Sequence, residues 1–185
     1  RDRNPWEETM CNGHKGMFEY VLNWQAWLVR YGWKKPKTFL AFIGKQGLGK
    51  NMMWEEFFIG GILGKSLGNM VQDMKRFQKN FNVARLNKVL HVFNECTSIQ
   101  HNNRTNWDLM KSLTELAFTA EPKGKESFRA TDPAGNVFMS NQRSPVLLEH
   151  DDRRYACTDM DAVHQKKHKY WKKLAAASPK ANATT

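Results

Sequence analysis

The stretch that most constrains the fold of this chain is an apolar run of strand length that leads directly into a glycine-rich turn. Residues 39–43 read FLAFI, residues 44–50 read GKQGLGK, and a helix-compatible segment follows. The turn matches G-x-x-x-x-G-K, in which glycines let the backbone point successive N–H groups inward and the lysine neutralises phosphate charge. Strand, turn and helix in this order predict a Walker A loop that holds phosphate at a helix N-terminus.

The predicted loop has one atypical position. Asn51 stands where a Ser or Thr hydroxyl normally binds Mg²⁺. Because the motif is short, its meaning depends on the rest of the chain. The residues that we expect to bind nucleotide are Gly44, Gln46, Gly47, Leu48, Gly49, Lys50 and Asn51.

The formal net charge of +11 is the strongest compositional signal. It favours a polyanionic partner, with nucleic acid first and a membrane surface second, and a basic surface kept for solubility is the alternative. The 185 residues fit one domain, with no apolar stretch long enough to span a membrane. Three separated cysteines favour a reducing compartment, so we expect a soluble intracellular protein, in the host cell if the source is viral.

Hydrophobic spacing predicts strands that alternate with helices, and hence an α/β sandwich around a mainly parallel sheet. We expect residues 1–15 to be irregular, residues 70–85 to hold a short strand and a helical turn, and residues 178–185 to be disordered. The other expected elements are helices at 17–33, 51–58, 104–116 and 161–177, strands at 38–43, 89–93, 136–140 and 154–157, and hairpin arms at 118–120 and 127–130.

Two polar residues follow predicted strands where a nucleotide hydrolase needs them. Glu95 follows the strand at 89–93, which we expect to neighbour the strand of the loop, and could polarise water. Asn141 follows the strand at 136–140 and could orient that water. The simpler alternative for Glu95 is that it caps a turn. The simpler alternative for Asn141 is that it is an ordinary turn residue.

Basic residues occupy two further candidate positions. Arg153 and Arg154 follow two aspartates and could stabilise phosphate charge in a neighbour's site, although such pairs are often surface ion pairs. Lys123 and Lys125 flank a glycine at the expected hairpin tip, which suits contact with a nucleic-acid backbone or a solvated turn.

The order of these motifs over residues 17–158 resembles superfamily 3 helicases, closest to the helicase part of viral, phage and plasmid primase–helicase proteins. The motifs are Gly44 to Lys50, Asn94-Glu95, Lys123-Gly124-Lys125, Met139-Ser140-Asn141 and Asp152-Arg153-Arg154. The resemblance implies an AAA+-like P-loop NTPase core that uses ATP and Mg²⁺ and assembles as a hexameric ring with nucleotide between subunits.

The resemblance also implies roles for single residues. Glu95 matches the water-activating acid of the Walker B pair, and Asn141 matches the sensor residue. Arg153 or Arg154 matches the arginine finger. Lys123 and Lys125 match the hairpin that touches single-stranded nucleic acid in the central channel.

Two residues depart from the family pattern. Asn51 replaces the Ser or Thr ligand, and Asn94 replaces the first Walker B acid, so that any magnesium ion carried by ATP meets neutral amide oxygens and is held weakly. We expect an ATPase and helicase of viral or mobile-element replication that turns over slowly. The alternatives are a non-catalytic nucleotide- and nucleic-acid-binding assembly module and a small-molecule or nucleoside kinase.

The expected organisation has three parts: a linker from a longer protein at 1–16, the ATPase domain at 17–160, and a basic helix with a tail at 161–185. The expected partners are single-stranded DNA in preference to RNA, other copies of the chain, and primase or other domains of the longer protein, but no membrane. The terminal lysines suit a second phosphate contact or a solvated helix face.

Overall fold

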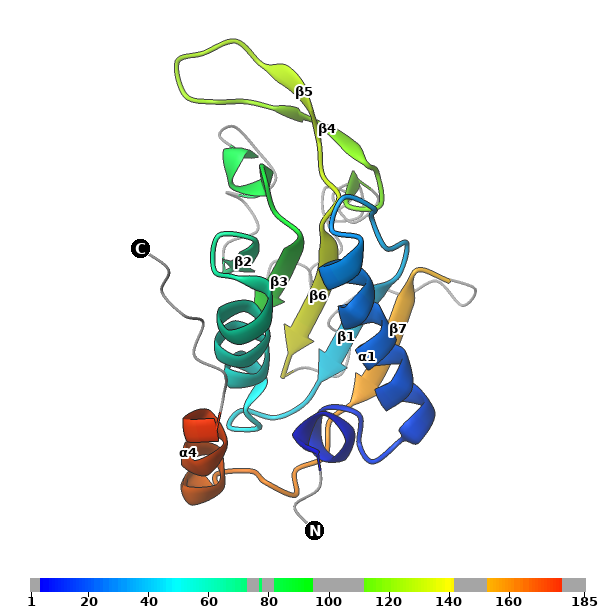
Figure 1. Cartoon of the computed structure of the whole chain (residues 1–185), viewed down its shortest axis with the longest axis vertical. Coiled ribbons are helices and arrows are strands. Elements are labelled where there is room, and N and C mark those ends of the chain that lie inside the picture. The colour runs from blue at the N-terminus through cyan, green and yellow to red at the C-terminus, as the bar shows by residue number, and fades with distance from the viewer. Residues whose placement is uncertain (1–3, 73–76, 78–81, 95–111, 142–152, 178–185) are drawn as a thin grey trace.

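The computed structural model describes residues 4–72, 77, 82–94, 112–141 and 153–177. Within these ranges a five-stranded sheet has the order β2-β3-β6-β1-β7, with every neighbouring pair parallel. The expected parallel α/β architecture is therefore confirmed (Figure 1). The strands are β1 (Phe39–Ile43), β2 (Gly68–Val71), β3 (Leu90–Asn94), β6 (Gly135–Ser140) and β7 (Tyr155–Asp159).

Alternation along the strands divides the core into two clusters. Leu40 and Phe42 of β1 pack into one cluster, whereas Phe39 and Ala41 pack into the other. This follows because successive side chains of a strand point to opposite faces of the sheet. All six residues of β6 are buried, since strands lie on both sides of it and its two faces are covered.

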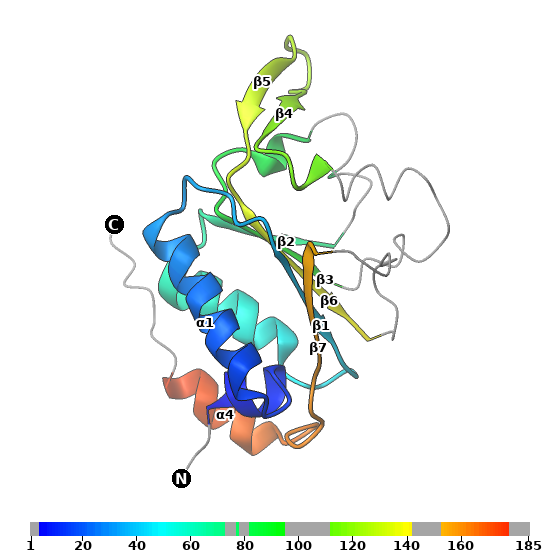
Figure 2. The same cartoon turned by 90° about the vertical axis from the view of Figure 1, so that its right-hand side faces the viewer.

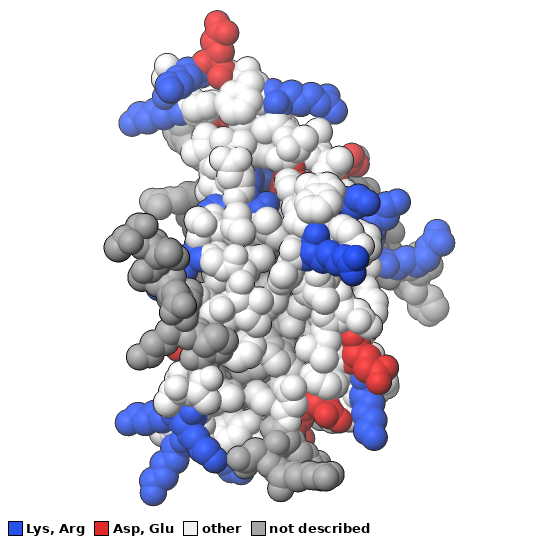
Figure 3. Space-filling model, viewed as in Figure 1, with Lys and Arg blue, Asp and Glu red and all other residues white. Residues whose placement is uncertain are grey.

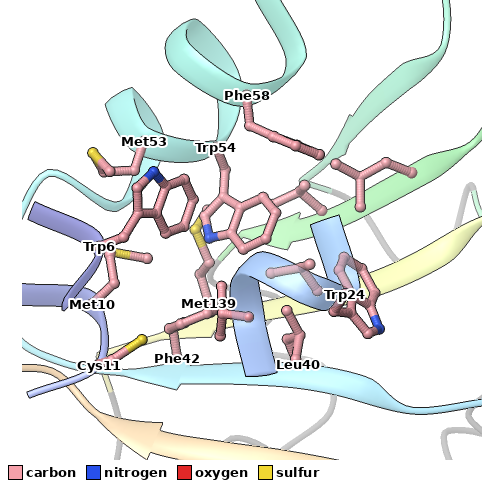
Figure 4. Packing of buried hydrophobic residues seen from close by; sticks show 14 of the residues in the cluster. Trp6, Met10, Cys11, Trp24, Leu40, Phe42, Met53, Trp54, Phe58 and Met139 are labelled. Carbon is pink, nitrogen blue, oxygen red and sulfur yellow. The ribbon is translucent and has the colours of Figure 1, made fainter. Parts of the chain in front are cut away.

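Four of the described helices lie on one face of the sheet (Figure 2). They are the π-helix η1 (Trp6–Met10), α1 (Lys15–Arg30), the π-helix η2 (Met52–Leu63) and α4 (His168–Ala177). Trp54 of η2 is the centre of this layer, with Trp6 at 5.0 Å, Phe42 at 5.6 Å and Trp24 at 6.3 Å between ring centroids (Figure 4). The two tryptophan pairs are edge-to-face and join the helices to one another, and the tilted Phe42 pair holds η2 against the sheet.

The expectation that residues 1–15 are irregular is wrong for its described part. Trp6, Met10 and Cys11 are buried in the core, and η1 carries the first two of them. The segment is too short and too polar to show a helical period, so only its docking against Trp54 reveals its place. Burial raises the pKa of the Cys11 thiol to about 12.

Several helix boundaries differ from the expected ones, including the end of α1 at Arg30 instead of residue 33, and three of the differences have local reasons. The helix α1 begins two residues early because the Nδ1 atom of His14 accepts from the Met17 amide and caps it. The helix η2 runs past the expected end to Leu63, and Gly64, with a φ of 99°, caps it. The helix α4 begins at His168, because a turn at residues 163–166 precedes it. Most of the helix expected at 104–116 falls outside the described residues.

The expected hairpin is confirmed as the antiparallel pair β4 (Ala117–Ala120) and β5 (Phe128–Thr131). It projects from the end of the sheet opposite α4 (Figure 1). A short 3₁₀ helix, η3 (Asn82–Arg85), lies at its base. The Asn82 side chain donates to the Thr119 carbonyl and accepts from the Glu121 amide, so it holds one arm of the hairpin.

Candidate functional site

The predicted Walker A loop joins β1 to η2 at the carboxyl edge of the sheet. Gly47 and Gly49 have φ values of 81° and 76°, a backbone region that other residues adopt only at a cost. The Gly44 amide donates to the Ser140 carbonyl at 2.9 Å and ties the loop to the neighbouring strand β6. The spacing of the glycines in the sequence thus corresponds to the backbone conformation that the loop needs.

Lys50 lies buried under this loop. Its Nζ atom donates to the carbonyls of Gly44 at 2.6 Å and Ser140 at 3.2 Å. Among the described residues, the amides of Gly47, Leu48 and Gly49 have no hydrogen-bond acceptor. Unpaired amides around a lysine charge at a helix N-terminus form the donor set that phosphate oxygens require.

Asn141 and Asn94 lie at the same edge of the sheet. Ser140 is in register with Ile43, so the exposed Asn141 follows beside Gly44. Asn94 ends β3 and pairs with Met139, one strand further away. Glu95 comes next in the chain but lies outside the described residues.

One expectation about this edge is wrong. The strand before Glu95 does not neighbour the strand of the loop, because β6 lies between β3 and β1. The strands that pair with β1 are β6, which Asn141 follows, and β7. Sequence order cannot reveal this, since a parallel sheet does not need to place strands in chain order.

The side chains fit phosphate better than they fit a divalent cation. Asn51 is exposed at the start of η2, where its side chain makes no capping hydrogen bond, and Asn94 is half-buried. In the described ranges, no three His, Cys, Asp or Glu side chains come together as a metal site. Mg²⁺ prefers carboxylates and phosphates, so Asn51 and Asn94 offer it only weak, neutral oxygens.

The C-terminal segment packs on the loop, which the sequence did not indicate. The Gln165 side chain donates to the Gln46 carbonyl at 3.0 Å, and the Lys166 amide donates to the Gly47 carbonyl at 3.3 Å. The Trp171 ring lies so close to Gly49 that a Cβ atom there would be 2.4 Å from the ring. The tryptophan within an otherwise basic segment is the one sequence signal for this contact.

The other candidate residues lie far from the loop. The hairpin that carries Lys123 and Lys125 projects from the opposite end of the sheet (Figure 1). Arg153 and Arg154 precede β7, and the Arg154 carbonyl accepts from the Phe39 amide at the start of β1. The five residues of β1, roughly 17 Å of strand, therefore separate these arginines from the loop.

A buried ionic cluster lies at the base of the hairpin and was not expected from the sequence. Asp132, just after β5, accepts from Arg85 at 2.6 Å and is 3.6 Å from Lys35 and 3.4 Å from His91. Lys35 also donates to the carbonyls of Asp132 and Ala134. The cluster thus joins the hairpin to three separate parts of the core.

Burial and charge shift the pKa values in this cluster. Burial lowers the pKa of Lys35 to about 8, against the opposing charge of Asp132. Burial also lowers the pKa of His91. For Asp132, burial acts to raise the pKa, but the hydrogen bond from His91 and the charges of Lys35 and Arg85 outweigh it and lower the pKa below its usual range.

The sequence of the chain matches one protein family over more than half of its length. A family described as "Family of unknown function (DUF5906)" matches residues 42–154, which contain the loop, both polar strand ends and the hairpin. The chain belongs to the DUF5906 family. No curated protein matches its sequence.

Solved structures share the fold of this DUF5906 chain. Two A-form apo structures of the NrS-1 C-terminal region match with TM-scores of 0.73 and 0.74, each at 17% identity, over 92% and 90% of the chain. A further apo structure of that region matches with a TM-score of 0.76 at 18% identity, over 91% of the chain. The DUF5906 chain covers 40–41% of the length of these structures.

These matches and the strand order identify the fold. It is the α/β fold of the NrS-1 C-terminal region, with the parallel sheet that the sequence predicts for a P-loop NTPase core. Among the described residues, no helix of the DUF5906 chain is long and apolar enough to cross a bilayer.

Proposed function

We propose that this chain is an ATP-driven motor domain that moves along single-stranded nucleic acid, DNA in preference to RNA. The observation that carries the proposal is the buried Lys50 under a glycine loop with unpaired amides, beside Asn141. The order of the sequence motifs supports the same function. Helicase activity goes beyond what the fold alone implies.

The proposal assigns a role to each candidate residue. The loop amides and Lys50 bind the β- and γ-phosphates, and Asn51 and Asn94 offer oxygens to a magnesium ion. ATP, when bound, supplies a phosphoryl bond whose hydrolysis is strongly favourable. Asn141 orients the attacking water, and Glu95 accepts its proton.

The distance of Arg153 and Arg154 from their own loop supports a role in an assembly. Since β1 separates them from that loop, they can act on a nucleotide only in a neighbouring subunit. A ring of subunits, six by the family resemblance, provides such neighbours. The hairpins with Lys123 and Lys125 then face one end of the ring and contact the backbone of the strand.

An ATPase assay with and without single-stranded DNA tests the proposal. Wild type should hydrolyse ATP faster with DNA, whereas Lys50→Ala should lose binding and turnover. Glu95→Gln should bind ATP and hydrolyse it at least about 100-fold more slowly, as expected for loss of a general base. Lys45→Ala, in the same loop but outside the assigned phosphate-binding set, is the matched control and should behave like wild type.

A second function has its own support. The contact of Trp171 with Gly49 and the neutral Asn51 and Asn94 suit a module that binds nucleotide without turnover. If the chain is such a module, ATP should bind in a way that depends on Lys50. Both wild type and Glu95→Gln should then hydrolyse ATP only at the background rate. Such a result would overturn the motor and leave the binding module.

A further inference from the structure

An aromatic and basic patch at the C-terminal end of α1 has no role in the nucleotide site. The aromatic ladder, as we call it, consists of Trp27, Tyr31 and Trp33, with ring centroids 4.8 Å apart for the first pair and 5.9 Å for the second. Trp33 is 67% exposed, the highest value among the large hydrophobic side chains of the described residues. Exposure of this degree is unusual for a tryptophan, and exposed aromatic patches often mark a binding surface.

The charge around the ladder has one sign. Arg30 and Lys34 each place a cationic group 5.3 Å from the centre of the Tyr31 ring. Residues 22–37 contain no acidic residue, and their basic residues are Arg30, Lys34, Lys37 and Lys35, the last of which has a buried side chain that is paired with Asp132. In Figure 3, Lys and Arg side chains lie over this end of α1, and side chains of both charges lie at the tip of the β4–β5 hairpin. A polyanion with flat apolar groups complements both properties of this patch.

The ladder is rigid and connected to the hairpin. The Trp27 indole donates to the Lys34 carbonyl at 3.0 Å, and the Lys34 amide donates to the Tyr31 carbonyl at 2.7 Å. The next residue, Lys35, donates to the Asp132 and Ala134 carbonyls at the base of the hairpin. The ladder and the hairpin therefore lie at the same end of the molecule, away from the loop (Figure 1).

We propose that the aromatic ladder binds single-stranded nucleic acid by stacking a base on Trp33 while Arg30 and Lys34 contact the adjacent phosphates. Stacking platforms beside basic side chains are the usual means of binding single strands without sequence preference. The proposal rests on the nucleic-acid partner of the proposed function but not on ATP hydrolysis. It adds a contact to bases where the hairpin lysines contact only phosphate.

Fluorescence anisotropy of a labelled dT20 oligonucleotide with the full chain tests the ladder. Trp33→Ala should weaken binding about fivefold or more, and Trp33→Phe should retain most of the affinity. Arg30→Gln and Lys34→Gln together should weaken binding and reduce the slope of log affinity against log salt by about 0.7 for each lost contact. Tyr20→Ala, an exposed aromatic on the same helix, is the matched control and should bind like wild type.

An abasic oligonucleotide of equal length separates stacking from charge. Wild type should bind it more weakly than dT20, and Trp33→Ala should bind the two equally. If Trp33→Ala binds dT20 as tightly as wild type does, the proposal is overturned. If Trp33→Ala fails to fold, the same result in the Arg30→Gln/Lys34→Gln variant overturns it. A changed sedimentation coefficient of Trp33→Ala with unchanged affinity would instead assign the ladder to contacts between copies.

The outcome for the ladder is distinguishable from that for the motor. Weak binding in Lys123→Ala/Lys125→Ala with normal binding in Trp33→Ala would overturn the ladder alone. Normal ladder results with background ATPase activity would overturn the motor alone. No binding of dT20 by wild type would overturn both.

Discussion

At the scale of single residues, Gly49 carries two requirements at once. Its φ of 76° allows the loop to turn before Lys50, and its missing side chain leaves room for the Trp171 ring. The motif explains only the first requirement. The second links the loop to α4, so the effect of a side chain at Gly49 depends on the C-terminal segment.

Gly49→Ala should therefore destabilise the fold by more than a positive φ alone explains. The backbone term costs about 1–2 kcal/mol, and the contact with Trp171 adds roughly 1–3 kcal/mol of overpacking. Gly13→Ala is the matched control, because Gly13 has a φ of 70° with open space around it, so it should show the backbone term alone. The measurement is the free energy of unfolding in urea.

The same substitution in a Trp171→Ala background separates the two terms. Gly49→Ala should then cost about as much as Gly13→Ala, because only the backbone term of about 1–2 kcal/mol is left. Equal costs for Gly49→Ala with and without Trp171 would contradict the packing of α4 on the loop.

At the scale of elements, the hairpin is held by η3 as well as by its own strand pairing. Asn82 makes two hydrogen bonds to the β4 arm, and the Arg85 guanidinium lies 4.2 Å from the centre of the Phe118 ring. A two-stranded hairpin is marginal in isolation. These contacts keep its base fixed to the sheet while its tip extends into solvent.

Asn82→Ala should loosen the hairpin and leave the nucleotide loop unchanged. Loss of two partly buried hydrogen bonds costs roughly 1–3 kcal/mol, so the amides of β4 should exchange hydrogen faster in mass spectrometry. Asn69→Ala is the matched control, because its side chain also donates to η3, at the Ala84 carbonyl, but from an exposed position. Faster exchange at β4 in the control but not in Asn82→Ala would contradict the anchor.

At the scale of the whole molecule, the sheet separates the two ends to which we assign functions. The loop, Asn141 and α4 lie at the carboxyl edge, while the hairpin and the aromatic ladder lie at the other (Figure 1). The cluster around Asp132 joins the second end to the core and is fully buried at Asp132 and His91. A buried charge network of this kind makes stability depend on pH.

Stability should fall on acidification, and His91 should cause the first part of the decline. Because the pKa of His91 is lowered in the folded state, the unfolded chain takes up the proton first as pH falls below 6.5. The lowered pKa of Asp132 acts in the same direction below pH 3.8. Urea unfolding at pH 7.5, 6.5, 5.5 and 4.5 measures the slope.

The variant His91→Gln should remove the decline that begins near pH 6.5. Exposed His168 provides the control, because His168→Gln changes a side chain that solvent reaches in both states. A decline of unchanged size in His91→Gln would show that another group is responsible.

The features that could be predicted from the sequence are those whose residues lie close together in the chain. The loop, five of the strands and the hairpin follow from local patterns of apolar spacing and glycines. The π-helix at Trp6 and the ionic cluster around Asp132 do not, because their partners lie far away in the chain. Lys35 and Asp132 are 97 residues apart, and no local pattern pairs them.

The sequence alone determined the glycine-rich turn between a strand and a helix and the polar residues that follow the strands, because both depend on local backbone geometry. The tertiary structure decided which strand neighbours the loop, which residues cover it, and which end carries the hairpin and the ladder. Strand order and docking depend on contacts between distant segments, and the free energy of those contacts exists only in the assembled core.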